Sequence, residues 1–304
     1  MTTDNTHSDG HSAPVFRGMD KSIGSHWEDV MIDISRSMSG QLNARLISQM
    51  GLGAETDEPI AFLDSACGAG PGAQELYKAV PRQVLEKSEI LCGDESPMMI
   101  DLVKKRIKDE GWVGTQARVI DAMDSGLESD SFTHVMISLG LHIMPRPDTV
   151  IKDVVRILRP GGVLGCITPH LDHTSWVAEF RRAFASFPFE APSFPEKNWS
   201  QLHEVGRWYD EAWVRTFLEE NGFGAVEARV ERGTTPIRNA KHWLDIFGPA
   251  LSYVLNTTWS EELRAAHELE EVKELIAEHL EEKYGGEGWD MDYALIFASG
   301  VVRK

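Results

Sequence analysis

The sequence predicts an α/β fold, a doubly wound parallel sheet. Short apolar runs alternate with amphipathic helical segments between about residues 60 and 168, which is the arrangement of βαβ units. A glycine-rich turn at residues 68–72 follows the first apolar run, where a parallel sheet presents its carboxyl edge to ligands. With 304 residues, 42% of them hydrophobic, the chain can bury a sizeable core.

The first 55 residues are predicted to lie outside this sheet. Residues 1–14 are polar and rich in Ser, Thr, His and Gly, a composition typical of a disordered tail. From about residue 23 to 50, apolar side chains recur every three to four positions and predict a helix, which ends at the breaker Gly51-Leu52-Gly53. Residues 15–55 are therefore expected to form an N-terminal helical cap.

The core of the sheet is expected within residues 56–170. The pattern predicts strands at 60–63, 90–92, 117–120, 134–138 and 163–168, and helices at 72–80, 97–109 and 148–158. Residues 171–304 are expected to complete the sheet, with a helix at 210–221, strands at 225–231 and 292–302, and two helical patterns across 240–284. Within them, about 171–208 and 240–288 are expected to be cap insertions over the ligand edge. Their aromatic content suits an apolar, partly planar ligand; the alternative is that they only widen the core.

The composition argues against several classes of function. The chain has 48 acidic against 30 basic residues and a formal net charge of −18, which disfavours nucleic acid or an anionic membrane as partner. Its three cysteines are too few and too scattered for a disulfide framework or a zinc site, and no metal is expected. The chain starts without a secretory signal and has no run of the about 20 apolar residues that cross a bilayer. A cytoplasmic protein is expected, with its oligomeric state open.

Two acids flank the glycine turn at strand ends. Asp64 directly precedes the turn and suits an ammonium group better than a diphosphate. Asp94 ends the second predicted strand, where a carboxylate can accept hydrogen bonds from both hydroxyls of a ribose. The alternatives are a tight turn without a ligand, a surface acid at Asp94, and ordinary core packing for the nearby Met99.

Four motifs, in order across about residues 60–168, resemble the class I S-adenosylmethionine-dependent methyltransferases. They are Asp64-Ser65-Ala66-Cys67-Gly68-Ala69-Gly70, Asp94-Glu95-Ser96-Pro97-Met98-Met99, Asp121-Ala122 with Leu127 and Asp130-Ser131-Phe132, and Ile157-Leu158-Arg159-Pro160-Gly161-Gly162. A dinucleotide-binding dehydrogenase would lack the last two. The resemblance implies a Rossmann-like methyltransferase sheet, mostly parallel with an antiparallel last strand, beneath a helical cap, and S-adenosyl-L-methionine as cofactor. The chain departs from the pattern at Thr133, where an acid usually supports the sheet edge.

The resemblance also implies which residues hold the methionine part of the cofactor. Gly68 and Gly70 would line it, and Asp64 with the backbone near Ala66 would lie close to its amino group. Ser138, at the end of the fourth predicted strand, would lie beside the methionine and the sulfonium.

For the adenosine part, the resemblance implies four further contacts. Asp94 would hold the ribose hydroxyls, and Met99 would lean on the adenine face. Asp121 would accept a hydrogen bond from the adenine amino group, while the backbone of Ala122 would read the edge of the ring.

A closer resemblance is to the fungal small-molecule thiol methyltransferases of the gliotoxin type, which act on dithiols of epidithiodiketopiperazines. It rests on Leu63-Asp64-Ser65-Ala66-Cys67-Gly68, Lys108-Asp109-Glu110-Gly111-Trp112-Val113 and Phe132-Thr133-His134-Val135, and it continues around Trp259. It is weaker at Leu141-His142-Ile143-Met144-Pro145, where the substrate would be chosen. It therefore implies the reaction, methyl transfer to a small-molecule acceptor, more strongly than the substrate.

The implied chemistry is an SN2 transfer from a sulfonium to a nucleophile, in which alignment and exclusion of water matter. A thiol needs little help from a base, whereas an amine or phenol depends on deprotonation. His142, just past the fourth predicted strand, is the candidate catalytic residue; the alternative is a histidine packed in the wall of the site. His170, Asp172 and His173 could also face the ligand or form a solvated loop, and packing is the simplest role for Cys67.

Other functions stay open at this stage. The enzyme could methylate N or O of a small metabolite, or it could be a cyclase or pericyclase that retains the cofactor without spending its methyl group. A non-catalytic sensor of the cofactor is a third class, which the aromatic cap disfavours because a sensor needs no acceptor pocket.

Overall fold

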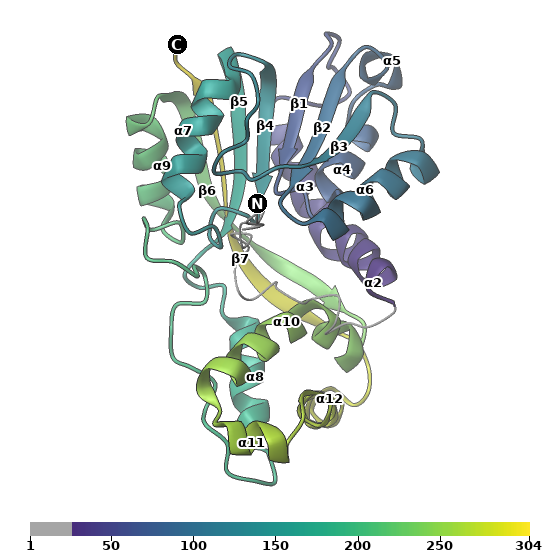
Figure 1. The fold of residues 1–304 in the computed structure, drawn as a ribbon, viewed down its shortest axis with the longest axis vertical. Helices are drawn as coiled ribbons and strands as arrows, with labels where there is room; N and C mark the ends of the chain where they lie inside the picture. The colour runs from purple at the N-terminus through teal and green to yellow at the C-terminus, as the bar shows by residue number, and fades with distance from the viewer. Residues whose placement is uncertain (1–25) are drawn as a thin grey trace, which may run out of the picture.

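The computed structural model describes residues 26–304, and its centre is one seven-stranded sheet (Figure 1). The strand order is β3-β2-β1-β4-β5-β7-β6, in which β1 to β5 pair in parallel and β7 is antiparallel to both β5 and β6. The strands are β1 (Ala61–Ser65), β2 (Glu89–Asp94), β3 (Thr115–Val119), β4 (Phe132–Ser138), β5 (Leu158–Pro169), β6 (Phe223–Ile237) and β7 (Trp289–Val302). The predicted mostly parallel sheet with an antiparallel last strand is confirmed.

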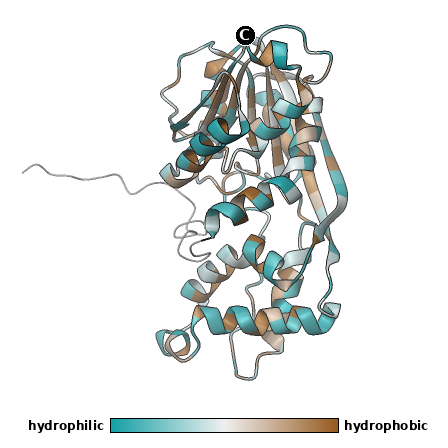
Figure 2. Ribbon diagram, turned by 90° about the vertical axis from the view of Figure 1, so that its right-hand side faces the viewer, coloured by the Kyte–Doolittle hydropathy of each residue, from teal (hydrophilic) through white to brown (hydrophobic). Residues whose placement is uncertain are grey.

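Helices cover both faces of this sheet. One face packs against α3 (Gly40–Gln49), α4 (Pro71–Ala79), α5 (Arg82–Leu85) and α6 (Pro97–Glu110), and the other against α7 (Pro147–Ile157) and α9 (Glu211–Glu220). Hydrophobic stretches run along strands of the sheet, whereas the helices that cover it also carry many hydrophilic residues (Figure 2). This alternation is the reason that strands and helices could be read from the sequence.

The N-terminal segment forms one helical rod with an irregular middle. A helix was predicted from residue 23 to 50, and the described part consists of α2 (Trp27–Ile34), the π-helical turn η2 (Ser35–Ser39) and α3. The predicted tail at 1–14, and residues 15–25 of the predicted cap, lie outside the described residues. Helix α3 ends at Gln49, close to the predicted breaker.

A separate helical lobe lies beyond the carboxyl ends of the parallel strands (Figure 1). It consists of α8 (Ser175–Ala185), α10 (Ala240–Thr258), α11 (Glu261–Ala266) and α12 (Leu269–Tyr284), which surround an aromatic core of their own. Trp176, Phe180 and Trp243 belong to this core. The rings of Trp176 and Phe247 stack with their centroids 5.5 Å apart. The lobe therefore has a core distinct from those against the sheet.

Strands β6 and β7 join the lobe to the sheet. The pairing of β5 with β7 stops at Pro169 and Leu295, but β6 and β7 remain paired as far as Ile237 and Trp289. Both strands thus continue past the sheet as a two-stranded ribbon into the lobe (Figure 1). Within residues 26–304, no helix is long and apolar enough to cross a membrane.

Candidate functional site

The predicted cofactor residues gather at the carboxyl edge of the sheet. Parallel strands end at the same edge, and this edge faces the helical lobe (Figure 1). Asp64 lies near the end of β1, Asp94 ends β2 and Ser138 ends β4. The edge therefore brings together acids that lie far apart in the sequence.

The glycine loop between β1 and α4 has an unusual backbone. Ala66, Gly68 and Gly70 all have left-handed φ values, of 54°, 51° and 80°. A Cβ on Gly68 would meet nothing within 4 Å, so this position borders open space. A Cβ on Gly70 would lie 3.3 Å from the Trp112 ring, so the side of Gly70 that lacks a side chain faces the protein interior. Gly68 leaves room for a ligand, whereas Gly70 allows close packing beneath the loop.

Asp94 joins this loop to β2. Its Oδ2 accepts a hydrogen bond of 2.9 Å from the Gly68 amide, and its Oδ1 accepts one of 3.0 Å from the Ser96 amide. Burial raises the pKa of the Asp94 carboxyl, and the two backbone hydrogen bonds oppose that rise. Ser96 also caps α6 by accepting from the amide of the buried Met99. The carboxyl is thus fixed in place at the strand end.

Asp64 is a buried acid without a cation. Its side chain is 2% exposed, and its Oδ2 accepts a 3.2 Å hydrogen bond from the Ala73 amide at the start of α4. Among residues 26–304, no ion pair involves it. Burial, helped by the charge of Asp94, raises the pKa of Asp64 to about 8 against the opposing Ala73 bond. This carboxyl would gain from a cationic ligand group, which would restore its charge.

Asp121 and Ala122 lie directly after β3. Asp121 Oδ1 accepts a 2.8 Å hydrogen bond from the Met123 amide and so forms a turn. The Ile120 amide donates to the carbonyl of Asp94 at 2.9 Å, which ties the turn to the end of β2. Both residues are partly exposed at the same edge as Asp94. The turn therefore places Asp121 and Ala122 beside the end of β2, and their adenine contacts stay a prediction.

His142 follows the end of β4 and lies among other histidines. Its carbonyl accepts from the Leu202 amide at 2.8 Å, and His203 Nε2 lies 2.9 Å from the carbonyl of Leu141. Its Nδ1 is buried and has no hydrogen-bond partner among the described residues. Burial, with smaller contributions from His173 and His203, lowers the pKa of His142 to about 3. A neutral imidazole, whose buried Nδ1 has no partner among the described residues, therefore lies just past the end of β4.

The other sequence candidates separate in the structure. Asp172 is exposed and pairs with Arg232 at 2.6 Å, which agrees with a solvated loop rather than a ligand contact. His173 is more enclosed, and burial lowers its pKa to about 4. Cys67 is buried, and its contact with Cys92 together with burial raises the pKa of the thiol well above its usual value. Cys67 therefore packs, as expected, and is not a nucleophile.

Thr133 replaces the usual acid without loss of support for the sheet edge. Its Oγ1 lies 3.0 Å from both the amide and the carbonyl of Ala61, so one hydroxyl accepts from β1 and donates to it.

Residues 26–304 contain no group of three or more His, Cys, Asp or Glu side chains placed to hold a metal ion.

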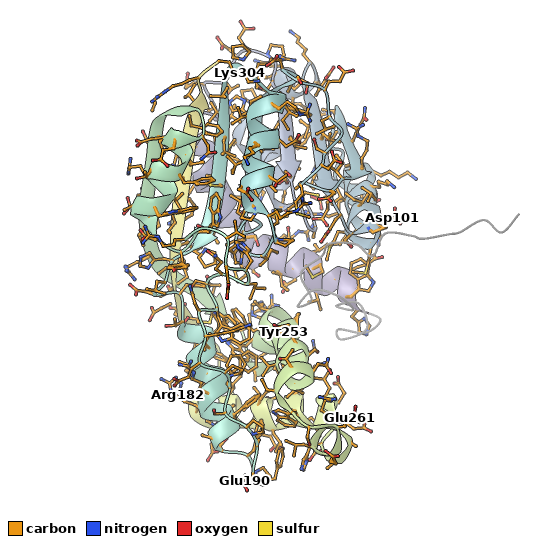
Figure 3. All side chains as sticks on the ribbon, turned by 60° about the vertical axis from the view of Figure 1, so that its left-hand side comes forward. Asp101, Arg182, Glu190, Tyr253, Glu261 and Lys304 are labelled. Atoms are coloured by element: carbon orange, nitrogen blue, oxygen red, sulfur yellow. The ribbon has the colours of Figure 1, made fainter. Side chains whose placement is uncertain are left out.

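Sequence reasoning missed residues that the lobe brings to this edge. Ser200 Oγ donates to the carbonyl of His170 at 2.8 Å, which fixes the segment around it against the end of β5. In this segment Lys197 Nζ lies 4.1 Å from the Trp199 ring and 4.6 Å from the Tyr253 ring. Tyr253 lies on the side of the lobe that faces the sheet (Figure 3). No local pattern joins residues 197 and 253, so only the fold could reveal this group.

Comparison with known proteins agrees with this geometry. A model of the ubiE/COQ5 methyltransferase family matches residues 16–234. The methyltransferase tpcH of Aspergillus fumigatus is 30% identical over 260 residues, which cover 84% of this chain and 89% of the relative. The acetylaranotin bis-thiomethyltransferase of Aspergillus terreus is 27% identical over 252 residues, which cover 83% of this chain and 85% of the relative.

Solved structures share the fold. The YcgJ protein of Bacillus subtilis superposes with a TM-score of 0.53 at 15% identity, covering 87% of this chain and 99% of its own. Phosphoethanolamine N-methyltransferase 2 of Haemonchus contortus, in complex with S-adenosyl-L-methionine, superposes with a TM-score of 0.56 at 15% identity. The match covers 95% of this chain and 59% of that structure's chain. The family match spans more than half of the sequence and includes the loop and both acids. The chain therefore belongs to the ubiE/COQ5 methyltransferase family, and it is an S-adenosylmethionine-dependent methyltransferase.

Proposed function

We propose that this enzyme transfers the methyl group of S-adenosyl-L-methionine to a thiol of a small molecule. The observation that carries the cofactor part of the proposal is the Asp94 carboxyl, held by the amides of Gly68 and Ser96 at 2.9 and 3.0 Å beside the open side of Gly68. A fixed acid at the end of the second strand, next to a glycine with free space, suits a ribose and its attached groups.

The residues at the edge fit this cofactor. Asp64 is a buried acid with no cationic partner among residues 26–304, so an ammonium group would satisfy it. Gly68 leaves room for the chain between the ammonium and the ribose. Asp121 and the backbone at Ala122 would face the adenine, with Met99 on its face and Ser138 near the sulfonium. When bound, the cofactor supplies an electrophilic methyl group.

His142 favours an acceptor that needs little base catalysis. With a pKa of about 3 it is neutral at physiological pH and a poor proton acceptor, but its free Nδ1 can orient a polar group. A thiol supplies some thiolate at neutral pH and is intrinsically reactive, whereas a phenol or ammonium must lose its proton first. The 27% identity to a bis-thiomethyltransferase also supports a thiol acceptor.

A small molecule is proposed over a nucleic acid because the chain carries a formal net charge of −18. Methyl transfer to N or O of a small metabolite is the alternative. A cyclase that retains the cofactor has no specific support in this chain, although the [4+2]-cyclase SpnF shares the fold with a TM-score of 0.50 at 13% identity.

Calorimetry with S-adenosylmethionine tests the cofactor site. Asp94→Ala is expected to abolish measurable binding. It removes the carboxylate that would accept hydrogen bonds from the ribose, and it removes the hydrogen bond that holds the Gly68 amide. Asp101→Asn is the matched control, since its side chain is 74% exposed at the periphery of the molecule (Figure 3). Unchanged affinity in Asp94→Ala would refute the assignment.

The acceptor is tested by incubating the enzyme and cofactor with matched dithiols, amines and phenols. Mass spectrometry should detect a gain of one or two methyl groups on the dithiols first. A gain on amines or phenols alone would favour the alternative. Cofactor binding with no methylated product in any class would favour a cyclase or a sensor.

A further inference from the structure

Arg106 of α6 is a charged side chain that is buried beneath the glycine loop. It is only 2% exposed. Its Nη1 donates to the carbonyl of Ala69 at 2.5 Å and to Ser35 Oγ at 3.2 Å, and its Nη2 donates to Gln74 Oε1. Its Nε donates to Glu110 Oε1 at 2.8 Å. All three nitrogens of the guanidinium group are therefore engaged.

These contacts link separate parts of the cofactor site. Ser35 belongs to the π-helical turn of the N-terminal rod, Ala69 to the glycine loop and Gln74 to α4. The guanidinium carbon also lies 4.8 Å from the centre of the Trp112 ring. Trp112 is the side chain against which Gly70 packs. Arg106 thus holds the loop directly at Ala69 and indirectly, through Trp112, at Gly70.

The loop needs such support because of its conformation. Ala66, Gly68 and Gly70 all occupy the left-handed region, which a flexible loop leaves readily. A cofactor that binds one loop conformation loses affinity in proportion to the time that the free loop spends in others. A rigid donor on the Ala69 carbonyl would keep the Gly68 amide aimed at Asp94 before the cofactor arrives.

We propose that Arg106 is a positioning residue that preorganises the glycine loop for the cofactor. This inference rests on the proposed cofactor site at that loop. Arg106 does not touch the reacting atoms; it acts through Ala69 and Trp112. The competing explanation is that Arg106 only forms a buried ion pair with Glu110 and stabilises the whole fold.

Two variants separate these explanations. Arg106→Lys keeps the charge but loses the forked contact with Ala69 and Gln74. Glu110→Gln, the matched control, removes the ion pair and leaves the Ala69 contact in place. The readouts are the Kd for S-adenosylmethionine, the kcat at saturating cofactor, and hydrogen exchange of residues 66–72 without cofactor.

Arg106→Lys should raise the Kd about tenfold or more and speed exchange at residues 66–72, with kcat at saturating cofactor within about threefold of wild type. Glu110→Gln should leave the Kd within about threefold. An unchanged Kd in folded Arg106→Lys, or equal losses in both variants, would overturn the proposal.

Loop exchange also decides the proposal when cofactor binding or folding fails. If the wild-type protein failed to bind the cofactor, the proposed function would fail, and loop exchange alone would decide whether Arg106 fixes the loop. Should Arg106→Lys not fold, Gln74→Ala replaces it, because it removes the hydrogen bond of Nη2 to Gln74 Oε1 and keeps the one to Glu110 Oε2 at 3.3 Å. Faster exchange confined to the loop would support the proposal, and exchange unchanged there would overturn it.

Discussion

The carboxyl group of Asp64 lies directly against the α-carbon of Gly72, with no space for a side chain between them. A Cβ on Gly72 would overlap both Asp64 Oδ2 and Met136 Cε. The same carboxyl oxygen accepts from the Ala73 amide at 3.2 Å, in the first turn of α4. Gly72 therefore lets a strand-end acid dock on a helix N-terminus, where free amides favour negative charge.

Gly72→Ala should weaken both the fold and the cofactor site. Overpacking in a tight core typically costs about 1–3 kcal/mol, and the Asp64 carboxyl must move to admit the methyl group. Urea denaturation and cofactor calorimetry measure the two effects. Gly53→Ala is the control because a Cβ there meets nothing within 4 Å. Equal stability and affinity in both variants would contradict this close packing.

Cofactor binding should release a proton from Asp64. With a pKa near 8 the free carboxyl is largely protonated at pH 7, and an ammonium group beside it would lower that pKa. Calorimetry at pH 7 in phosphate and in Tris should then give different enthalpies, consistent with release of up to about one proton. Asp64→Asn should remove the difference. Identical enthalpies for the wild-type enzyme in both buffers would argue against an ammonium at Asp64.

His142→Ala should slow methyl transfer more than it weakens cofactor binding. Loss of one orienting hydrogen bond corresponds to a rate lower by about tenfold, whereas most of the proposed cofactor contacts, Asp64 and Asp94 among them, lie on other strands. His142→Gln keeps a hydrogen-bond acceptor and should recover most of the rate if His142 orients the acceptor. If His142 must instead accept a proton, His142→Gln should stay as slow as His142→Ala. A wild-type rate in His142→Ala would remove His142 from the reaction.

The unliganded enzyme should be most stable near neutral pH. Burial lowers the pKa of His134, His142 and His173 to about 4, 3 and 4, so below about pH 6.5 the unfolded chain binds protons that the folded chain does not. Each histidine then lowers the free energy of unfolding by at most about 1.4 kcal/mol per pH unit as the pH falls.

Asp64 acts in the opposite direction at higher pH. Its folded pKa of about 8 lies above its ordinary value of 3.8, so the stability it contributes is lost progressively as the pH rises from about 4 to 8. Above about pH 6.5 the histidines no longer offset this loss. Urea denaturation from pH 5 to pH 9 should therefore show a maximum. Asp64→Asn should flatten the alkaline side, and a wild-type profile without an acid decline would contradict the burial of the histidines.

The sequence was most informative where local patterns carry the structure. The strands around the glycine loop and both acids were predicted because apolar periodicity and turn residues are local signals. The π-helical turn at residues 35–39 was not predicted, because the apolar spacing of the rod continues through it. Helix α8 was also missed, inside a stretch dominated by aromatic and proline residues, and the second helical pattern predicted within residues 240–284 is divided into α11 and α12.

The site shows the same division. Asp64 and Asp94 follow from their positions at strand ends, but the partners of Arg106 come from residues 35, 69 and 74 and leave no pattern in the sequence. Likewise, Lys197 and Tyr253 meet only because two distant segments of the chain pack together in the lobe. Long-range contacts of this kind depend on tertiary packing, which local periodicity does not encode.

The ribbon of β6 and β7 gives the lobe a modular character. Ile237 and Trp289 are paired neighbours, so the chain leaves the ribbon and returns to it at adjacent points. The part of the lobe within residues 238–288 can therefore change without displacing a strand of the sheet, together with α8, which packs in the same core. Selectivity for new acceptors could diversify through such changes while the half of the enzyme that holds the methyl donor stays constant.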